Sequence, residues 1–544
     1  MLREEIKKLI EKAIKDLQKE KKLPDFEIPE ILVEKPKEKL YGDYSTNVAI
    51  IIAKIIKKNP LEVVNLLGLE LKTKGLEPFE KIEIAGPGFI NFYSSKEYLQ
   101  KQVKEILKQK EKFGDLKIGN KQKINLEFIS ANPTGPLTLG NGRGGFCGDV
   151  LANILKRAGY KVTREYYIND VGEQIKKLGH SVLGDEQAVY KGAYIENLKK
   201  KILLGRTSQY SAEEIGEKGA KLLLKEMIRP AVRKMGIKFD NWFSEKSLYK
   251  KGEVDKAIKE LSKKGLTYES EKAVWFKCKN LGDDKDRVLI RSDGIKTYFA
   301  SDIAYLKSKI KRGFDILVMF LGADHYGYVA RMKAATEALG FNKDNLRMIV
   351  MQLVRLFETG KEVRMSKRSG IYLTIDELID EVGLDAARFF FLMRGPDTHL
   401  NFNMDLAKKQ SAENPVYYVQ YAHARICSIF KKLKAQSAKL KTAHCSHTTT
   451  QSLKLLNHQT ELDLIKQLMG LPEIIEDTAK DYQVQRLPQY ATDLADVFHG
   501  FYENCRVITE DKELTEARLA LVLATKIVLK NTLGLMGISA PERM

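Results

Sequence analysis

The sequence lacks the features that mark membrane and secreted proteins. No apolar run in its 544 residues approaches the roughly 20 that a membrane-spanning helix needs, so we expect no membrane partner. The first 20 residues carry apolar side chains at helical spacing among charged ones, which is typical of an amphipathic packing helix and not of a signal peptide. Only five cysteines are present, without a C-x-x-C pair, and this favours a reduced, cytoplasmic protein.

Metal-binding patterns are also scarce. The run "HCSH", residues 444–447, lies in a polar stretch rich in Ser and Thr and has no second cluster of ligands beside it. A structural zinc site normally takes its ligands from two such clusters. We therefore expect no tightly bound, protein-ligated metal.

Positive charge, in contrast, is abundant. The chain has 92 Lys and Arg against 72 Asp and Glu, which gives a net charge of +20. An excess of this size favours a polyanionic partner, with nucleic acid as the first candidate, although a lysine-rich surface without such a partner has the same composition. A hydrophobic content of 43% and the length of 544 residues indicate a globular protein of roughly three or four domains.

Secondary-structure patterns divide the chain into three parts. Residues 1–112 combine an amphipathic helix with a strand–turn–strand, "KIEIAGPGFINFY", and indicate an α+β domain. From 120 to 380, apolar strands alternate with helical patterns, which predicts an α/β, Rossmann-type parallel-sheet domain with a charged helical insertion at about 175–285. Residues 381–544 are helical in period and predict an all-α bundle. The strands of the central part are expected at "INLEFIS", "VTREYYI", "TYFASDIAY", "ILVMFLGADH" and "RMIVMQLVRL".

A glycine-rich stretch, "GPLTLGNGR", follows the first of these strands. Gly140, Gly142 and Gly145 fit the G-x-G-x-x-G pattern of dinucleotide-binding loops, and Glu165 lies 20 residues further on. In that pattern, however, the first glycine turns directly off the strand. Here a proline-containing stretch separates Ser130 from Gly140, which argues against a dehydrogenase.

The alternative is a loop that leads into the N-terminus of a helix and binds phosphate there. Gly140 and Gly142 would let a nucleotide approach the backbone closely. A cationic partner occurs downstream in "VRMSKRSG", where Lys367 and Arg368 lie in a short polar loop. Such a loop could close over a triphosphate and stabilise negative charge that develops at the α-phosphate.

These strings resemble a known family. "TLGN" stands where class I aminoacyl-tRNA synthetases carry their HIGH motif, and "RMSKR" stands where they carry KMSKS. The longer strings "EFISANPTGPLTLGNGRGG", "GYKVTREYYINDVGEQI", "LGADHYGYVARM" and "GLMGISAPERM" are similar to those of arginyl-tRNA synthetases, over nearly the whole chain. The resemblance implies that ATP and L-arginine form arginyl-adenylate, usually with tRNA bound, and that the arginine then passes to tRNA(Arg).

The resemblance also implies roles for individual residues, together with ATP bound as its Mg²⁺ complex, a tRNA-contacting N-terminal domain, an anticodon-binding helical domain and a monomeric enzyme. The catalytic residues would be Lys367, Ser366, Thr138 and Asn141. ATP would be bound by Gly135, Pro136, Leu137, Thr138, Leu139, Gly140, Asn141, Gly142, Gly322, Asp324, Met365 and Lys367. Arginine would be bound by Glu127, Ser130, Asn132, Tyr298, Asp302 and His325, with Tyr298 and Asp302 at the guanidinium group. The tRNA would contact Tyr417, Tyr421, Arg425, Tyr44 and Asn47.

The chain departs from the family at both histidines of the HIGH motif. Thr138 and Asn141 replace them, and both can still donate hydrogen bonds to phosphate oxygens, but neither can become cationic. Loss of a charge-assisted bond weakens transition-state stabilisation by roughly 1–2 kcal/mol per contact. We therefore expect the same reaction at a reduced rate.

Three alternatives stay open on the sequence alone. A non-catalytic tRNA-binding relative would explain the loss of both histidines, although it would need no pocket for arginine. A class I ligase for another cationic amino acid, such as lysine, would use similar carboxylates. A dehydrogenase is the third, and nicotinamide bound to the purified protein would support it.

Overall fold

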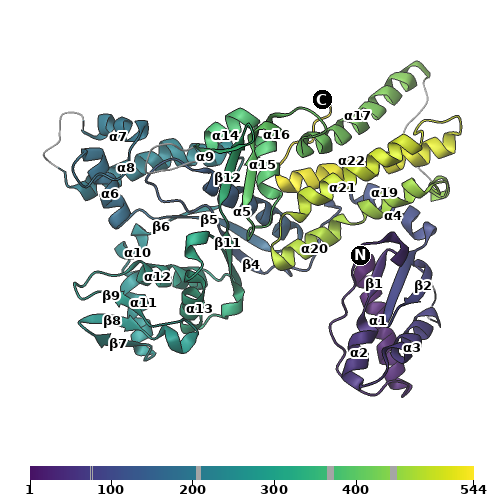
Figure 1. Ribbon diagram of the computed structural model, residues 1–544, viewed down its shortest axis with the longest axis horizontal. Helices are drawn as coiled ribbons and strands as arrows, with labels where there is room; N and C mark the ends of the chain where they lie inside the picture. Colours follow the sequence, from purple (N-terminus) through teal and green to yellow (C-terminus); the bar gives the residue numbers. More distant parts are fainter. Residues whose placement is uncertain (74, 76, 204–209, 364–372, 441–449) are drawn as a thin grey trace.

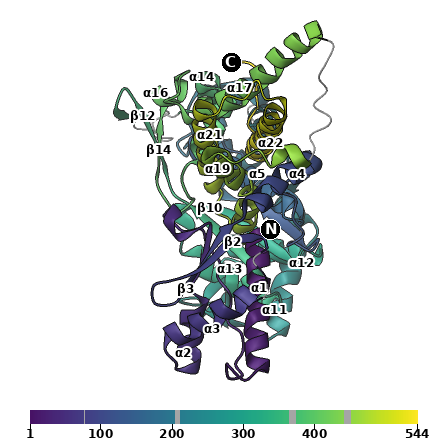
Figure 2. The ribbon, with the colours of Figure 1, turned by 90° about the vertical axis from the view of Figure 1, so that its right-hand side faces the viewer.

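The computed structural model describes residues 1–73, 75, 77–203, 210–363, 373–440 and 450–544. A parallel sheet stands near the middle of an elongated molecule, and the C-terminal helices lie to one side of it (Figure 1). The N-terminal unit lies beside those helices, as Figure 2 shows from a second direction.

The N-terminal unit packs three helices on a small antiparallel sheet of strand order β1-β3-β2. The predicted amphipathic helix is confirmed, because its apolar stripe from Leu2 to Leu17 is buried. The predicted strand–turn–strand is confirmed as well, by the pairing of the last two strands. The elements are α1 (Leu2–Lys19), β1 (Tyr44–Thr46), α2 (Val48–Ile56), α3 (Pro60–Thr73), β2 (Phe79–Ala85), β3 (Phe89–Ser94) and the outgoing α4 (Lys96–Gln109).

The central sheet has five parallel strands in the order β11-β10-β4-β5-β6. Its strands are β4 (Lys123–Glu127), β5 (Lys161–Ile168), β6 (Asn241–Ser244), β10 (Ile316–Gly322) and β11 (Leu346–Met351). Strand order reverses beside β4, which is where open α/β sheets usually bind their ligands. Helix α5 (Leu139–Arg157) connects β4 to β5 across one face.

Two groups of elements occupy the range expected as an insertion. The first is helical: α6 (Glu173–Leu183), α7 (Ala193–Leu203), α8 (Ala212–Leu223) and α9 (Arg229–Lys234). The second follows β6 and comprises α10 (Lys246–Lys250), α11 (Glu253–Lys263) and the antiparallel strands β7 (Thr267–Ser270), β8 (Ala273–Phe276) and β9 (Arg287–Ile290). Since β6 belongs to the main sheet, the two groups are separate additions to it.

One predicted strand is wrong. The stretch "TYFASDIAY" begins helix α12 (Tyr298–Lys311), whose first turn is capped by the Thr297 side chain, which accepts a hydrogen bond from the backbone N–H of Ala300. Aromatic and β-branched residues raised the strand propensity, but burial against β10 and α13 (Tyr328–Ala338) favours the helix. Thr297, a typical N-cap residue, is the feature of the sequence that indicates a helix start here.

A third sheet leads from the central sheet to the C-terminal helices. It has the order β13-β12-β14 and contains β12 (Val354–Glu358), β13 (Lys361–Val363) and β14 (Leu400–Asn403). Helices α14 (Ile375–Val382), α15 (Leu384–Leu392) and α16 (Met404–Lys408) surround it.

From Pro415 onward every described element is helical, whereas the range predicted as all-α, 381–544, also contains strand β14. The helices from Pro415 onward are α17 (Pro415–Leu440), α18 (Thr450–Leu453), α19 (Gln459–Leu468), α20 (Leu471–Asp481), α21 (Arg486–Asn504) and α22 (Lys512–Met536). Helix α22 is long and apolar enough to cross a membrane, contrary to the expectation that no run approaches that length. Within the protein, however, 72% of its apolar window is buried, as in the core helix of a folded domain.

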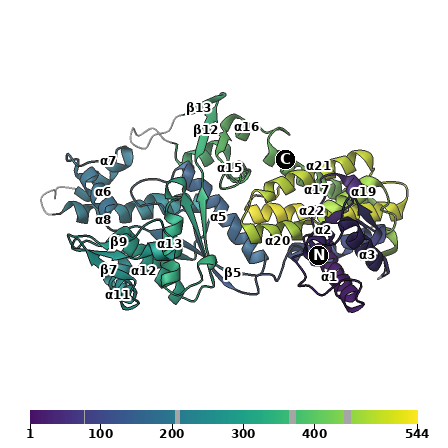
Figure 3. The ribbon, with the colours of Figure 1, turned by 60° about the horizontal axis from the view of Figure 1, so that its bottom comes forward.

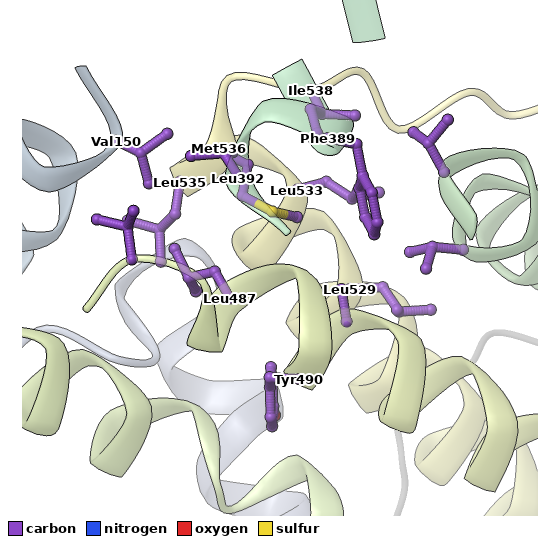
Figure 4. Packing of buried hydrophobic residues seen from close by; sticks show 14 of the residues in the cluster. Val150, Phe389, Leu392, Leu487, Tyr490, Leu529, Leu533, Leu535, Met536 and Ile538 are labelled. Atoms are coloured by element: carbon purple, nitrogen blue, oxygen red, sulfur yellow. The ribbon is translucent and has the colours of Figure 1, made fainter. Parts of the chain in front are cut away.

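One continuous hydrophobic core joins the central sheet to these helices. Figure 4 shows Val150 of α5, Phe389 of α15, Leu487 of α21 and Leu533 of α22 gathered in it. A buried ion pair reinforces this contact. The Arg388 guanidinium, 1% exposed, donates to Asp149 Oδ2 at 3.0 Å and to the carbonyl of Met536 at the end of α22 at 2.9 Å.

The N-terminal unit lies beside the C-terminal helices (Figure 3), and polar side chains connect the two. Arg3 Nη2 lies 2.7 Å from Glu476 Oε2 of α20. The Tyr44 hydroxyl donates to Glu473 of the same helix at 2.7 Å, and Tyr44 is only 4% exposed. Tyr44 therefore lies at this contact, with its ring inside the protein.

Replacing Asp149 by alanine leaves the buried guanidinium of Arg388 without its carboxylate partner. We expect the free energy of unfolding to fall by about 3–5 kcal/mol, because an uncompensated buried charge is costly. Urea unfolding followed by the fluorescence of Trp242, which stacks on Tyr166 of the same core, measures the change.

The matched control is Lys409→Ala, since Lys409 forms an exposed ion pair with Glu413. This change should cost less than about 1 kcal/mol. Equal effects of the two substitutions would contradict the structural importance of the buried pair.

Candidate active site

Two adjoining cavities open at the carboxyl ends of β4 and β10. We call the first the α5 pocket, which has a volume of about 390 Å³. It is lined by residues 138–141, 322–324, 351–354 and Leu373. The second, the acidic pocket, has a volume of about 750 Å³. Its lining includes Glu127, Ser130, Asn132, Tyr167, Glu245, Tyr298, Asp302, His325, Tyr328 and Arg331. Ile129, Phe320 and Gly322 line both, so a ligand in one can reach the other.

The α5 pocket is built around the N-terminus of α5. The Asn141 side-chain oxygen accepts hydrogen bonds from the backbone N–H and the hydroxyl of Thr138, at 3.0 and 2.9 Å. This arrangement is a variant of the capping box and fixes the first turn. The first backbone N–H groups of a helix have no partners within it, and the helix dipole places partial positive charge there. The pocket is therefore suited to an anion.

The segment after the basic loop returns to this helix start. The backbone N–H of Ile375 donates to the Leu137 carbonyl at 3.0 Å, and Thr138 forms an isolated β-bridge with Thr374. The Ile375 side chain fills the space where a Cβ on Gly142 would stand, at 2.5 Å, so Gly142 serves close packing. Thr374 and Ile375 are thus attached to the start of α5.

The expected ATP-binding residues divide into three groups. The wall of the α5 pocket includes Thr138, Leu139, Gly140, Asn141, Gly322 and Asp324. Four others, Gly135, Pro136, Leu137 and Gly142, lie next to that wall without lining it, and Leu137 is fully buried. Met365, Ser366 and Lys367 lie outside the described residues.

All six residues expected to bind arginine line the acidic pocket: Glu127, Ser130, Asn132, Tyr298, Asp302 and His325. They come from the end of β4, from α12 and from the short turn Ala323–His325 after β10. At the end of β4 the chain turns through positive φ at Ile129 (65°) and Ser130 (40°). Such conformations are uncommon for non-glycine residues and often occur at functional sites.

The carboxylates of the acidic pocket differ in how they are compensated. Glu127 accepts hydrogen bonds from the fully buried Lys309 ammonium at 2.5 Å and from the Ser130 hydroxyl at 3.1 Å. Asp302 accepts a hydrogen bond from the Tyr328 hydroxyl. Burial is the main cause that raises the pKa of Asp302 to about 7, and the charge of Glu127 adds to it.

Sequence reasoning missed one carboxylate in this pocket. Glu245 follows β6 and is 2% exposed. Burial raises the pKa of Glu245 to about 7, and the negative charge of Asp302 contributes to the shift. Glu245 could have been found if residues 241–244 had been predicted as a strand of the main sheet. Residues that follow parallel strands gather at one edge of the sheet.

Glu165, the acid that the dinucleotide alternative requires, lies inside the protein beneath the acidic pocket. It accepts hydrogen bonds from Arg312 Nη2 at 2.9 Å, from the Tyr305 hydroxyl at 2.6 Å and from the Asn241 amide at 2.6 Å. The residue is 0% exposed, so it cannot bind a ribose. Together with the proline-containing approach to Gly140, this argues against the dehydrogenase.

Residues expected to contact tRNA lie in different surroundings. The Arg425 guanidinium donates to the Tyr421 hydroxyl at 2.7 Å and lies 4.3 Å from the ring centre of Tyr502. Tyr421, Arg425, Lys431, Lys432 and Arg543 line a cavity of about 460 Å³. Tyr417 is half-buried on the same helix, α17. Asn47 lines a cavity of the N-terminal unit, whereas Tyr44 is buried beside Glu473.

The chain is similar to proteins of known kind over its full length. Residues 102–426 match the family model "tRNA synthetases class I (R), catalytic domain", residues 4–94 match "Arginyl tRNA synthetase N terminal domain", and residues 419–544 match "DALR anticodon binding domain". Arginine–tRNA ligases of Caldanaerobacter subterraneus subsp. tengcongensis and Bacillus subtilis are each 45% identical, over 100% of this chain and 99% and 98% of theirs. The structure of Thermus thermophilus arginyl-tRNA synthetase superposes with a TM-score of 0.78 at 22% identity, covering 100% of both chains.

The buried Glu165 gives the protein a definite acid sensitivity. Burial acts to raise its pKa, but Arg312, Lys309 and Tyr305 outweigh burial and lower the pKa from 4.5 to about 2. A carboxyl whose folded pKa is depressed stabilises the protein above its unfolded pKa and loses that contribution as the pH falls toward the folded pKa. The contribution is about 3 kcal/mol.

We therefore expect the stability of the protein to fall between pH 4.5 and about 2 partly because Glu165 is protonated. Urea unfolding at a series of pH values measures this. Glu165→Gln should lower the stability at pH 7 and flatten the slope of stability against pH in that window. An unchanged slope would contradict the ionised state of Glu165.

Proposed function

The chain belongs to the arginyl-tRNA synthetase family, and on that premise we propose how its two pockets divide the work of the reaction. The reaction is the ATP-dependent ligation of L-arginine to its cognate tRNA through arginyl-adenylate, and the chain is a class I aminoacyl-tRNA synthetase. One observation carries the proposal: all six residues expected to bind arginine line a single acidic pocket that adjoins the N-terminus of α5.

The acidic pocket binds arginine. A guanidinium group has a planar set of donors that carboxylates accept well, so we place it between Asp302 and Glu245, with the Tyr298 hydroxyl beside it. The α-amino and α-carboxylate groups then lie near Glu127, Ser130 and Asn132, at the end of β4. From there the α-carboxylate faces the α5 pocket through the lining that the two cavities share.

The α5 pocket binds ATP, with the phosphates at the N-terminus of the helix. An oxygen of the arginine carboxylate attacks the α-phosphorus, the bond to the β-phosphate oxygen breaks, and pyrophosphate leaves. The backbone N–H groups of residues 139 and 140 stabilise the negative charge on the α-phosphate. Mg²⁺ enters with ATP and compensates the charge of the departing pyrophosphate. Lys367 is assigned the same task on the motif that it shares with the family.

The Thr138 hydroxyl donates to the side-chain oxygen of Asn141, so its proton is already engaged within the first turn of α5. The side-chain nitrogen of Asn141 takes no part in that bond. We therefore assign the phosphate contact to Asn141 and the capping of α5 to Thr138.

The remaining assignments concern tRNA and the surroundings of the enzyme. We propose that the anticodon binds at Tyr417, Tyr421 and Arg425 of α17, and that Asn47 of the N-terminal unit contacts the body of the tRNA. Aromatic faces beside an arginine suit unstacked bases, and the net charge of +20 suits the polyanion. The domains are proposed as 1–112, 120–380 and 381–544, in a monomeric enzyme of the cytoplasm without a membrane partner.

Charging of tRNA tests the function. Purified chain, ATP, Mg²⁺, radiolabelled arginine and tRNA(Arg) should give arginyl-tRNA, whereas lysine should give no charged product. In the same assay Asp302→Asn should raise the KM for arginine by about 10- to 100-fold, because it removes an ionic hydrogen bond to the guanidinium group.

The control is Asp293→Asn, which changes an exposed aspartate in the turn before α12 and should leave the KM for arginine unchanged. An unchanged KM in Asp302→Asn would show that another acid binds the guanidinium. Binding of tRNA without any charging would favour the non-catalytic relative instead.

The two carboxyls with a pKa of about 7 make arginine binding dependent on pH. Below that pH each holds a proton and is neutral, while a cationic ligand favours the ionised form. We therefore expect the KM for arginine to rise as the pH falls from 8.5 to 6, and to rise less steeply in Glu245→Gln. Initial rates at a series of arginine concentrations and pH values measure this. A KM that is independent of pH in the unaltered enzyme would contradict the assignment.

A further inference from the structure

Arg143, the last residue of "GPLTLGNGR", has no role in the reaction as described so far. It lies on α5 two residues after Asn141, and its side chain is 0% exposed. Its guanidinium group donates to three backbone carbonyls: Gln352 at 2.8 Å, Gly395 at 2.7 Å and Thr398 at 2.7 Å. One side chain of the motif helix therefore joins two distant segments of the chain.

The burial of this charge is unusual. Within the described residues, no carboxylate lies within ion-pair distance of Arg143, in contrast to Arg388, which pairs with Asp149. A buried cation that relies on neutral carbonyls is costly to keep ionised, so a purely structural position would be filled better by an apolar side chain. The planar set of donors does, however, fix several carbonyls at once, which neither lysine nor an apolar residue can do.

The carbonyl of Gln352 belongs to the joint between β11 and β12. The Gln352 backbone N–H donates to the Pro396 carbonyl at 2.8 Å, and the Leu353 carbonyl accepts from the Leu400 N–H at 3.1 Å. Arg143 supplies a third bond, to the Gln352 carbonyl, and ties this joint to α5. Three hydrogen bonds thus fix the backbone at residues 352 and 353.

The joint forms part of the wall of the α5 pocket. Residues 351–354 line the pocket together with the helix start, and Leu353 is 63% exposed there. The exposed leucine beside Met351 offers an apolar face, and among the described backbone groups of residues 352 and 353 the Leu353 N–H is the one left for a ligand. The helix start suits phosphates, so the wall formed by residues 351–354 is the place for the purine base.

We propose that Arg143 is a positioning residue for the base of ATP: it holds the joint at residues 351–354 at the distance from α5 that an adenine ring requires. The inference rests on the proposed binding of ATP in the α5 pocket. It predicts that Arg143 affects the binding of ATP and not that of arginine, although the two pockets share part of their lining. It also predicts that selection of adenine over guanine depends on Arg143, because the backbone of the joint would contact the edge of the base.

The test compares Arg143→Met and Arg143→Lys with Arg388→Met in the full chain. Arg388 is the matched control, since it is also a buried arginine that contacts α5 and backbone carbonyls, but it lies away from the pocket. Aminoacylation with saturating arginine and tRNA gives the KM for ATP, and kcat/KM with ATP and with GTP gives the selection of the base. The KM for arginine and the melting temperature are measured for every variant.

Arg143→Met should raise the KM for ATP by about 10-fold or more, narrow the preference for ATP over GTP, and leave the KM for arginine within about twofold. Arg143→Lys should lie between Arg143→Met and the unaltered enzyme, because lysine keeps the charge but not the planar donors. Arg388→Met should lower the melting temperature and leave the KM for ATP within about twofold.

An unchanged KM for ATP in Arg143→Met would overturn the proposal, and so would equal rises in the KM for ATP and for arginine. If Arg143→Met does not fold, the KM for ATP and the KM for arginine of Arg143→Lys decide between the outcomes. The unaltered enzyme tests the proposed function separately, because its failure to charge tRNA with arginine would refute that function. If the unaltered enzyme charges normally and Arg143→Met keeps the same KM for ATP, only the role of Arg143 is refuted.

Discussion

Helix α5 is buried along most of its length, and the charged side chains that it carries into the interior must find partners there. Asp149 pairs with Arg388, which also binds the carbonyl of Met536, so the end of α22 is fixed to the helix. Arg143 binds carbonyls of the β11–β12 joint and of the loop before β14. The start of α5 is therefore held in place relative to the central sheet and to the C-terminal helices at once. A helix N-terminus that is to stabilise a transition state needs such rigidity, because misplacement of a donor weakens its contribution.

The acidic pocket and the region beneath it contain buried carboxylates, whose removal from water opposes folding. Glu127 is compensated by the buried Lys309, and Glu165 beneath it by Arg312, so neither depends on a ligand. Among the residues that the structure describes, neither Asp302 nor Glu245 forms an ion pair. Burial raises the pKa of each to about 7, although the charges of Lys309 and Arg331 act to lower that of Asp302. In the binding that we propose, a guanidinium group supplies the cation for these two carboxyls. Selectivity for a planar cation would then follow from the electrostatics of the pocket, at some cost to stability.

Much of this could be predicted from the sequence, for reasons that particular residues make clear. Periodicity located α1, β4, β5 and β10, and the motif strings placed Glu127, Tyr298, Asp302 and His325 in one pocket before any contact was known. Local propensity failed at residues 298–305, where aromatic and β-branched side chains favour a strand but packing against β10 and the Thr297 cap produce a helix. Glu245 was missed because the short strand β6 has no clear pattern, and Tyr44 was expected at the surface because its contact with Glu473 joins residues 429 positions apart. Contacts of this kind depend on tertiary packing, which periodicity does not report.

We propose that an acidic pocket and a helix N-terminus meet so that the arginine carboxylate faces the α-phosphate. A crystal structure of the chain with L-arginine and a non-hydrolysable ATP analogue tests this arrangement most directly. We expect the guanidinium group between Asp302 and Glu245, the triphosphate at the backbone N–H groups of residues 139 and 140, and the purine ring against Leu353. A guanidinium group bound elsewhere, or a triphosphate that does not contact the start of α5, would contradict it.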